Sequence, residues 1–135
     1  MDTSAVIAIL RNEPAGTRCA DALAEAEVAR ISAATYLEAA IVVDGSRSPV
    51  LSRQFDDLIE AAGMMIAPVT ERHVQLARAA YRTFGRGSGH PARLNFGDCF
   101  AYALARETDD PLLFVGSDFA HTDIRSAVDW RDSGP

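Results

Sequence analysis

Short β-type segments alternate with longer helical ones along this chain of 135 residues, and this alternation constrains its fold most. The β-type segments are 28–32, 64–69 and 112–115, and 127–130 is a further short candidate. Residues 112–115, LLFV, are apolar at every position, as in strands that are buried on both faces of a parallel sheet. The pattern predicts one α/β domain in which helices cover a central parallel sheet.

Asp98 is the only charged residue between Leu94 and Ala105, in a stretch with the composition of a buried helix. The positions three and four residues away on such a helix carry no cation that could pair with it. Burying an unpaired carboxylate costs several kcal/mol or forces it to take up a proton. The sequence therefore predicts that the partner of Asp98 comes from elsewhere in the chain or from solution.

Three further acids occupy comparable positions. Glu38 is the only charge between Ile31 and Val43, and Asp118 follows the 112–115 segment closely. Asp2 takes an equivalent place if a strand leads into it. Ligands of such folds bind beyond the carboxyl ends of the strands, where these acids are expected to converge. Simpler interpretations are open for each: a helix cap for Asp2, a turn residue for Asp118, and exposed helix edges for the other two.

A cluster of these four acids needs a positive partner, and oxygen ligands without Cys or His suit Mg²⁺ or Mn²⁺. A carboxylate-held divalent ion can activate water, orient a phosphodiester and neutralise charge on the departing oxygen. This donor set indicates hydrolysis of a nucleic-acid backbone. The hydroxyls of Thr3 and Ser4, beside Asp2, could hold a carboxylate or a metal-bound water, or could cap the helix that follows.

The composition predicts a single cytoplasmic domain. Hydrophobic residues make up 48% of the chain, no apolar run reaches the roughly 20 residues that cross a bilayer, and no secretion signal is recognisable. Cys19 and Cys99 lack metal-ligand spacing and are expected to be reduced, buried thiols.

The formal net charge of −6 argues against a general nucleic-acid binder, but the positive charge is unevenly distributed. Residues 72–93 form a basic segment that contains His73, His90, Arg78, Arg82, Arg86 and Arg93. The segment is either a local basic patch or a solvated helix face followed by a polar loop. Its glycine-rich part, 85–93, is expected to be a mobile lid or binding loop.

Four stretches carry a resemblance to a known family: DTSAVIAIL at the start, SAATYLEAA around Glu38, ARAAYRTFGRGSGHPARLNFGDCFAYALA around Asp98, and PLLFVGSDFAHTDI around Asp118. In this order they resemble the PIN-domain ribonucleases, specifically the VapC toxins of bacterial type II toxin–antitoxin modules. The likeness runs over nearly the whole chain and makes residues 1–135 a single PIN domain.

The resemblance implies a three-layer α/β/α fold and an endoribonuclease that depends on Mg²⁺ or Mn²⁺. The acidic cluster of the family falls on Asp2, Glu38, Asp98 and Asp118. Asp2, Asp98 and Asp118 would contribute to the metal site, and Glu38 would assist directly or through water. The implied partners are RNA, a cognate VapB antitoxin in a hetero-oligomer, and a second copy of the chain; Arg86 and Arg93 are the candidate phosphate contacts.

Two features depart from the family pattern. Only Met1 precedes Asp2, where the family has an apolar strand, so we expect a truncated first strand and a higher melting temperature if upstream residues are restored. Asp123 either joins the acidic cluster or caps a helix, and capping is the favoured interpretation.

The sequence is also compatible with other functions. One is a structure-specific DNA nuclease with similar metal chemistry, and another is a non-catalytic subunit that acts through its antitoxin in a DNA-binding repressor complex. A phosphotransferase with an aspartate nucleophile is disfavoured, since position 4 is Ser rather than a second aspartate.

Overall fold

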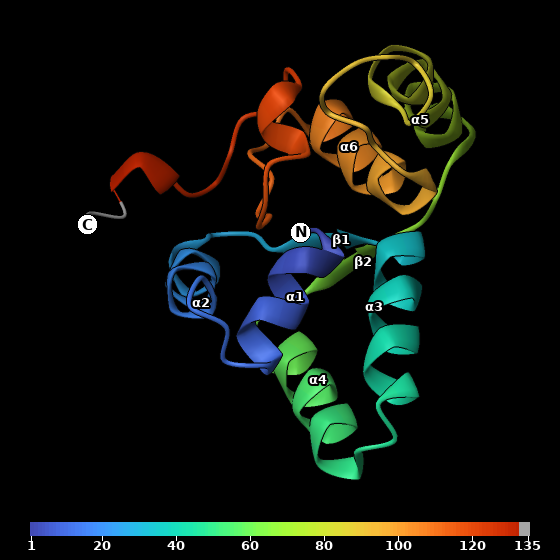
Figure 1. Cartoon of the computed structure of the whole chain (residues 1–135). Helices are drawn as coiled ribbons and strands as arrows, with labels where there is room; N and C mark the ends of the chain where they lie inside the picture. The colour runs from blue at the N-terminus through green and yellow to red at the C-terminus, as the bar shows by residue number, and fades with distance from the viewer. Residues whose placement is uncertain (133–135) are drawn as a thin grey trace.

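The computed structural model describes residues 1–132. Helices and short strands alternate along this part of the chain, as Figure 1 shows. The elements are α1 (Thr3–Leu10), α2 (Gly16–Glu25), β1 (Arg30–Ser32), α3 (Ala33–Gly45), α4 (Pro49–Ala61), β2 (Met65–Ala67), α5 (Glu71–Phe84), α6 (Phe96–Thr108) and the 3₁₀ helices η1 (Phe119–His121) and η2 (Trp130–Asp132). None of the helices in residues 1–132 has the length and apolar character needed to cross a membrane.

The sheet at the centre is parallel, as the sequence predicts. Strands β1 and β2 pair with Ile31 opposite Ile66, which confirms two of the predicted strands in shortened form. Beyond β1, the terminal amine of Met1 donates to the carbonyl of Arg30 at 2.9 Å, and the amide of Asp2 donates to the carbonyl of Leu113 at 2.9 Å. The first two residues therefore lie between β1 and the 112–115 segment.

The prediction of a regular strand at 112–115 is wrong. Only Leu112 forms a parallel bridge, with Ser126, and the candidate strand at 127–130 is likewise absent, since η2 begins at Trp130. The physical reason lies in the amide of Val115, which donates to the hydroxyl of Ser4 at 3.0 Å instead of to a neighbouring strand. The segment is extended and buried but contributes a single ladder position.

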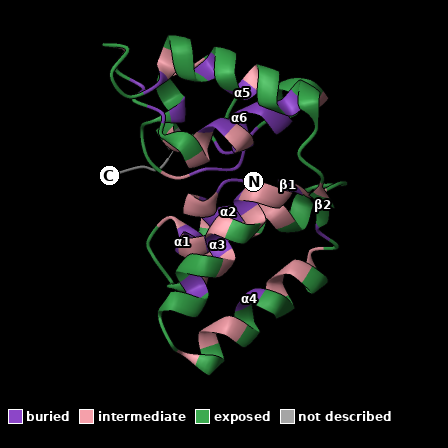
Figure 2. Cartoon of the chain, turned by 90° about the vertical axis from the view of Figure 1, so that its right-hand side faces the viewer, coloured by how far each residue is buried: buried purple, intermediate pink, exposed green. Residues whose placement is uncertain are grey.

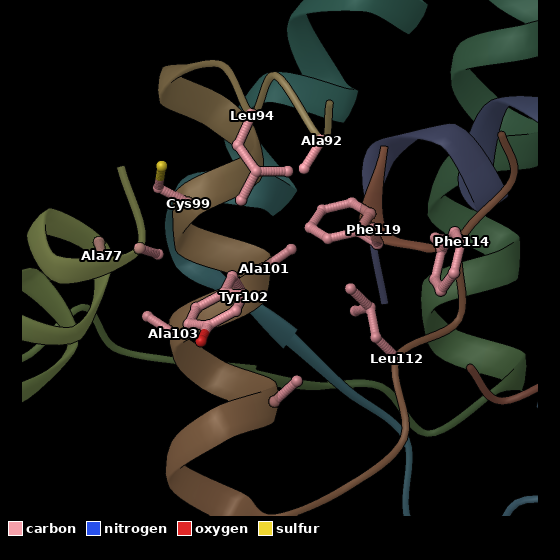
Figure 3. Packing of buried hydrophobic residues seen from close by; sticks show 12 residues of the cluster. Ala77, Ala92, Leu94, Cys99, Ala101, Tyr102, Ala103, Leu112, Phe114 and Phe119 are labelled. Atoms are coloured by element: carbon pink, nitrogen blue, oxygen red, sulfur yellow. The ribbon is translucent and has the colours of Figure 1, made fainter. Parts of the chain in front are cut away.

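Two apolar cores lie on opposite sides of this extended segment. Leu112 and Phe114 belong to the core that contains α5 and α6, whereas Leu113 and Val115 pack into the core that contains α1, α3 and α4. This alternation is the two-residue period of extended backbone. Figure 3 shows Leu112, Phe114 and Phe119 beside the buried face of α6. The result is the predicted three-layer arrangement, with helices on both faces of the parallel sheet.

Small side chains let α5 and α6 pack closely in the first of these cores. Ala77 and Ala80 of α5 are buried in the same cluster as Ala103 of α6. Most of the buried residues of α6 lie in its second and third turns, and the outer face of α5 is exposed (Figure 2). Cys19 and Cys99 are both free and buried, as expected from the sequence.

Candidate metal-dependent active site

Asp2 is held at the start of α1 by two groups of Ser4. It is the N-cap residue, 4% exposed, and its Oδ2 accepts hydrogen bonds from the amide of Ser4 at 3.1 Å and from the hydroxyl of Ser4 at 2.6 Å. The same hydroxyl accepts from the amide of Val115. Capping is thus part of the role of Asp2, and the predicted capping by Thr3 or Ser4 is wrong. Ser4 instead anchors the Asp2 carboxylate to the extended segment.

Glu38 reaches the same region from the middle of α3. Its Oε1 accepts a hydrogen bond from the hydroxyl of Thr3 in the first turn of α1. Its Oε2 lies against α6, only 2.0 Å from the position that a Cβ atom would take at Gly97. The hydroxyls of Thr3 and Ser4 therefore each donate to a carboxylate, which confirms one of the roles predicted for them.

Asp98 lies in the first turn of α6, not in the middle of a buried helix as the composition indicated. The helix begins at Phe96, and Asn95 is its N-cap. The two side chains form a reciprocal capping box, in which Asn95 Oδ1 accepts from the amide of Asp98 at 2.9 Å and Asp98 Oδ2 accepts from the amide of Asn95 at 3.0 Å. One oxygen of Asp98 is thereby engaged by the backbone of its own helix.

The pKa of Asp98 shows that all four predicted acids lie close enough to interact electrostatically. Burial is the largest cause that raises the pKa of Asp98, and the capping hydrogen bond from Asn95 opposes it. The negative charges of Asp2, Asp118 and Glu38 raise it further, so that the pKa reaches about 6 instead of 3.8. No cation contributes to this shift. The arrangement stores mutual repulsion that a bound cation would relieve.

Asp118 is the least constrained of the four. It is exposed, directly precedes η1, and its side chain makes no capping hydrogen bond there. The interpretation of Asp118 as a turn residue is confirmed for its backbone, and its negative charge also raises the pKa of Asp98.

The four carboxylates share an electrostatic region but not a ready-made coordination sphere. Among residues 1–132, no three Asp, Glu, His or Cys side chains are gathered closely enough to hold a metal ion together. A Mg²⁺ ion commonly keeps several waters and uses only one or two protein carboxylates, with substrate phosphates completing the shell. The all-oxygen donor set and the raised pKa of Asp98 fit such a hydrated hard cation.

Asp123 belongs to a different group. It accepts a hydrogen bond from the hydroxyl of Tyr102 at 2.8 Å and lies 3.7 Å from a guanidinium nitrogen of Arg106, both on α6. The prediction that Asp123 caps a helix is wrong, and so is the alternative that it joins the acidic cluster. This acid is a structural link between α6 and the segment after η1.

Both histidines of the basic segment make contacts within the chain, whereas its arginines are exposed. His73 is 3% exposed and its Nε2 lies 2.9 Å from Glu107, while Nδ1 of His90 accepts from the amide of Ala92. Arg86 and Arg93 are exposed, and neither forms a salt bridge within the described part of the chain. They remain able to contact an anion.

The glycine-rich loop that carries these arginines is closed by backbone hydrogen bonds. The amide of Arg86 donates to the carbonyl of Leu94 at 2.9 Å, and the amide of Leu94 donates to the carbonyl of Phe84 at 2.8 Å. Ser88 and His90 make further bonds within the loop. These bonds favour a structured loop over the mobile lid expected from its composition.

Two residues of the site were not recognised from the sequence. Asn95 could have been found, because N-x-x-D before an apolar run is a variant of the capping-box pattern. Gly97 could not, since its importance depends on Glu38, which is 59 positions away in the chain (97 − 38).

Comparisons with known proteins agree with this arrangement. A family model described as PIN domain matches residues 1–125. The chain is 60% identical over 131 residues to a protein of Mycobacterium bovis named VapC ribonuclease Mb0625 and to one of Mycobacterium tuberculosis named Ribonuclease VapC28, covering 97% of this chain and 98% of each relative. It is 44% identical to Ribonuclease VapC42 of M. tuberculosis over 94% of this chain and 97% of that protein.

Proposed function

The chain belongs to the PIN-domain family and to its VapC branch, and from this premise we propose that it acts as a single PIN domain that hydrolyses RNA phosphodiester bonds as the toxin of a type II toxin–antitoxin system. The relatives that are named ribonucleases match nearly the whole chain. The observation that carries the proposal is the raised pKa of Asp98: burial raises it most, the charges of three other carboxylates raise it further, and no cation lowers it.

We assign the metal site to Asp2, Asp98 and Asp118, with Mg²⁺ or Mn²⁺ as the ion. When bound, a divalent ion supplies a polarised water and neutralises charge on the phosphate. Ser4 fixes the orientation of the Asp2 carboxylate through its hydroxyl. The oxygen of Asp98 that is not engaged by Asn95 is free to turn toward the ion.

Glu38 is assigned the role of positioning the attacking water and accepting its proton. Its Oε1 is engaged by Thr3, which leaves Oε2 as the acceptor. As the water oxygen bonds to phosphorus, its proton passes to Oε2, the ester bond to the leaving oxygen breaks, and that oxygen takes up a proton from solvent water. The raised pKa of Asp98 indicates that loss of its proton near pH 6 prepares the site for a cation.

The test is cleavage of a mixed pool of structured RNAs with Mg²⁺, with Mn²⁺ and with EDTA. Asp98→Asn should abolish cleavage, whereas Asp123→Asn, an acid paired elsewhere on α6, is the matched control and should not. Mn²⁺ should also raise the melting temperature of the native protein but not that of Asp98→Asn, because only a ligand that binds the folded state stabilises it. Cleavage that persists in EDTA would contradict the metal assignment.

The same assay separates the competing functions. Flap and single-stranded DNA should remain intact if the protein is a ribonuclease. Cleavage of flap DNA in place of RNA would indicate a structure-specific DNA nuclease. Failure to cut any RNA with either metal, together with no metal-dependent rise in melting temperature, would favour the non-catalytic subunit.

Arg86 and Arg93 are proposed to contact RNA phosphates. Both are exposed on the loop that leads into α6, close in sequence to Asp98. Arg86→Ala and Arg93→Ala should each weaken RNA binding and reduce its salt dependence by about one phosphate contact. Arg53→Ala, an exposed arginine of α4, is the control and should leave both unchanged.

The proposed partners are a cognate VapB-type antitoxin and a second copy of the chain. A basic antitoxin side chain placed among the four carboxylates would replace the metal, so purified antitoxin should inhibit cleavage when added stoichiometrically. The dimer face is proposed to be a groove of about 840 Å³ between α5 and α6, lined by apolar residues that include Val74, Tyr81 and Phe96. The 78% exposure of Phe96 argues for a covering partner.

Light scattering during size exclusion tests this dimer. Phe96→Ser should shift the mass from two chains toward one. Val50→Ser removes an apolar side chain that is 64% exposed on α4 and should not change the mass. An unchanged mass for both variants would place the dimer face elsewhere.

A further inference from the structure

We propose that Gly97 positions the carboxylate of Glu38, because the space that glycine leaves on α6 is the space that this carboxylate occupies. The inference rests on the proposed nuclease, in which Glu38 assists hydrolysis. Gly97 would be a positioning residue of the proposed active site, although it has neither a polar side chain nor a charge.

The contact distances carry the argument. A Cβ atom at position 97 would lie 2.0 Å from Oε2 of Glu38, 2.8 Å from its Cδ and 3.1 Å from its Oε1. Real Cβ atoms essentially never approach another heavy atom closer than 3.0 Å. Because Oε1 also accepts from Thr3, the carboxylate is confined between the first turns of α1 and α6. Those two turns carry or adjoin Asp2 and Asp98.

The backbone conformation does not explain the glycine. The glycines with positive φ among the described residues are Gly63, Gly87, Gly89 and Gly116, and Gly97 is not one of them. It lies in the right-handed helix α6, where alanine is the better helix former. Position 97 therefore requires a residue without a side chain.

A side chain at position 97 should change the site without unfolding the domain. The atoms that a new Cβ would meet belong to the far end of a flexible glutamate side chain. The carboxylate can swing away at modest cost, but it then loses Thr3 and leaves its place near Asp2 and Asp98. Function should suffer far more than folding.

The test is a double-mutant cycle of Gly97→Ala, Glu38→Ala and the double variant, assayed on RNA with Mn²⁺. Gly97→Ala should lower the cleavage rate about 100-fold, as far as Glu38→Ala does, and should cause no further loss in the Glu38→Ala background. Gly45→Ala is the matched control. This glycine ends α3, a Cβ there would meet nothing within 4 Å, and its cleavage rate should stay within about twofold.

The same variants are also compared by melting temperature without metal, a measurement that does not depend on activity. In the Glu38→Ala background, Gly97→Ala should raise the melting temperature by up to about 3 °C, since alanine favours the helix. With Glu38 present the gain should be smaller or reversed, because the carboxylate is displaced. If Gly97→Ala has the same effect in both backgrounds, on melting temperature and on cleavage, the proposal is overturned. If the native protein cuts no RNA, the proposed function fails while the melting temperatures still decide whether the two residues are coupled.

Discussion

The acids near the two ends of α6 differ in whether a positively charged or hydrogen-bonding side chain lies beside them. In the first turn, Asp98 faces three other carboxylates and no cation, and its pKa is raised to about 6. In the last turn, Glu107 lies 2.9 Å from the buried His73, and Asp123 packs nearby against Tyr102 and Arg106. Every acid at the second end has a partner within the chain.

The difference separates a structural role from a functional one. A paired acid stabilises the packing of the elements that it joins, and its removal is expected to affect folding. An unpaired acid among like charges stores repulsion, so its removal is expected to affect function and to leave folding unharmed. The residue type is the same at both ends; the surroundings decide its role.

The largest expected effect is on catalysis at the first end. Asp2→Asn should lower metal-dependent RNA cleavage by at least about 100-fold, because the amide keeps the capping oxygen but removes the charge that attracts the ion. Glu107→Gln should leave the rate within about twofold, since Glu107 lies at the opposite end of α6. Initial rates at saturating Mn²⁺ measure both. Equal losses of cleavage rate in the two variants would contradict the distinction between the two ends of α6.

The second effect is on folding at the other end. Glu107→Ala removes the hydrogen-bond partner of the buried His73, whose Nδ1 already has no partner in the described structure. Leaving the second nitrogen unpaired should lower the free energy of unfolding by about 1–3 kcal/mol. Urea denaturation measures it, with Glu60→Ala, an exposed glutamate of α4, as the control. A loss no larger than that of the control would mean that the contact with His73 is not stabilising.

The third effect is a pH-dependent gain in stability at the first end. The pKa of Asp98 is about 6 in the folded protein and 3.8 as its ordinary value, so the folded state retains the proton more tightly. The contribution of Asp98 to wild-type stability therefore falls as the pH rises from about 4 to 6, and Asp98→Asn escapes this loss while its side-chain oxygen can still accept from the Asn95 amide. A shift of about 2 pKa units corresponds to roughly 3 kcal/mol, which solvent screening of this partly exposed group reduces to about 1 kcal/mol.

Chemical denaturation in EDTA at several pH values checks this prediction. The variant should be more stable than the wild type at pH 7.5, and the difference should shrink toward zero near pH 4. A difference that stays constant over this range would show that it does not arise from the carboxyl proton. A less stable variant would show that the capping hydrogen bond of Asp98 outweighs the repulsion.

The smallest effect is expected for Tyr102→Phe. Burial and the hydrogen bond to Asp123 raise the pKa of Tyr102 to about 12, so the hydroxyl stays protonated and donates throughout the neutral range. Its loss should cost about 1 kcal/mol in urea denaturation without changing the cleavage rate. Tyr81→Phe, on an exposed tyrosine, should cost less. A lower cleavage rate for Tyr102→Phe would mean that the hydrogen bond to Asp123 also affects the site at the other end of α6.

Much of the fold could be predicted because its evidence is local. The strands at 28–32 and 64–69 follow from the composition of segments a few residues long. The failure at 112–115 has a non-local cause, since the amide of Val115 is taken by Ser4, more than a hundred residues earlier in the chain.

By itself the sequence determined that Glu38 and Asp98 lack cationic partners on their own helices, because helical neighbours can be counted along the chain. It also determined the family, since the motifs occur in order. Only the tertiary structure decided that Asp123 lies beside a cation while Asp98 does not, and that Gly97 makes room for Glu38. Electrostatic repulsion and steric contact depend on distance in space, and the packing of α1, α3 and α6 sets these distances between residues that are far apart in the chain.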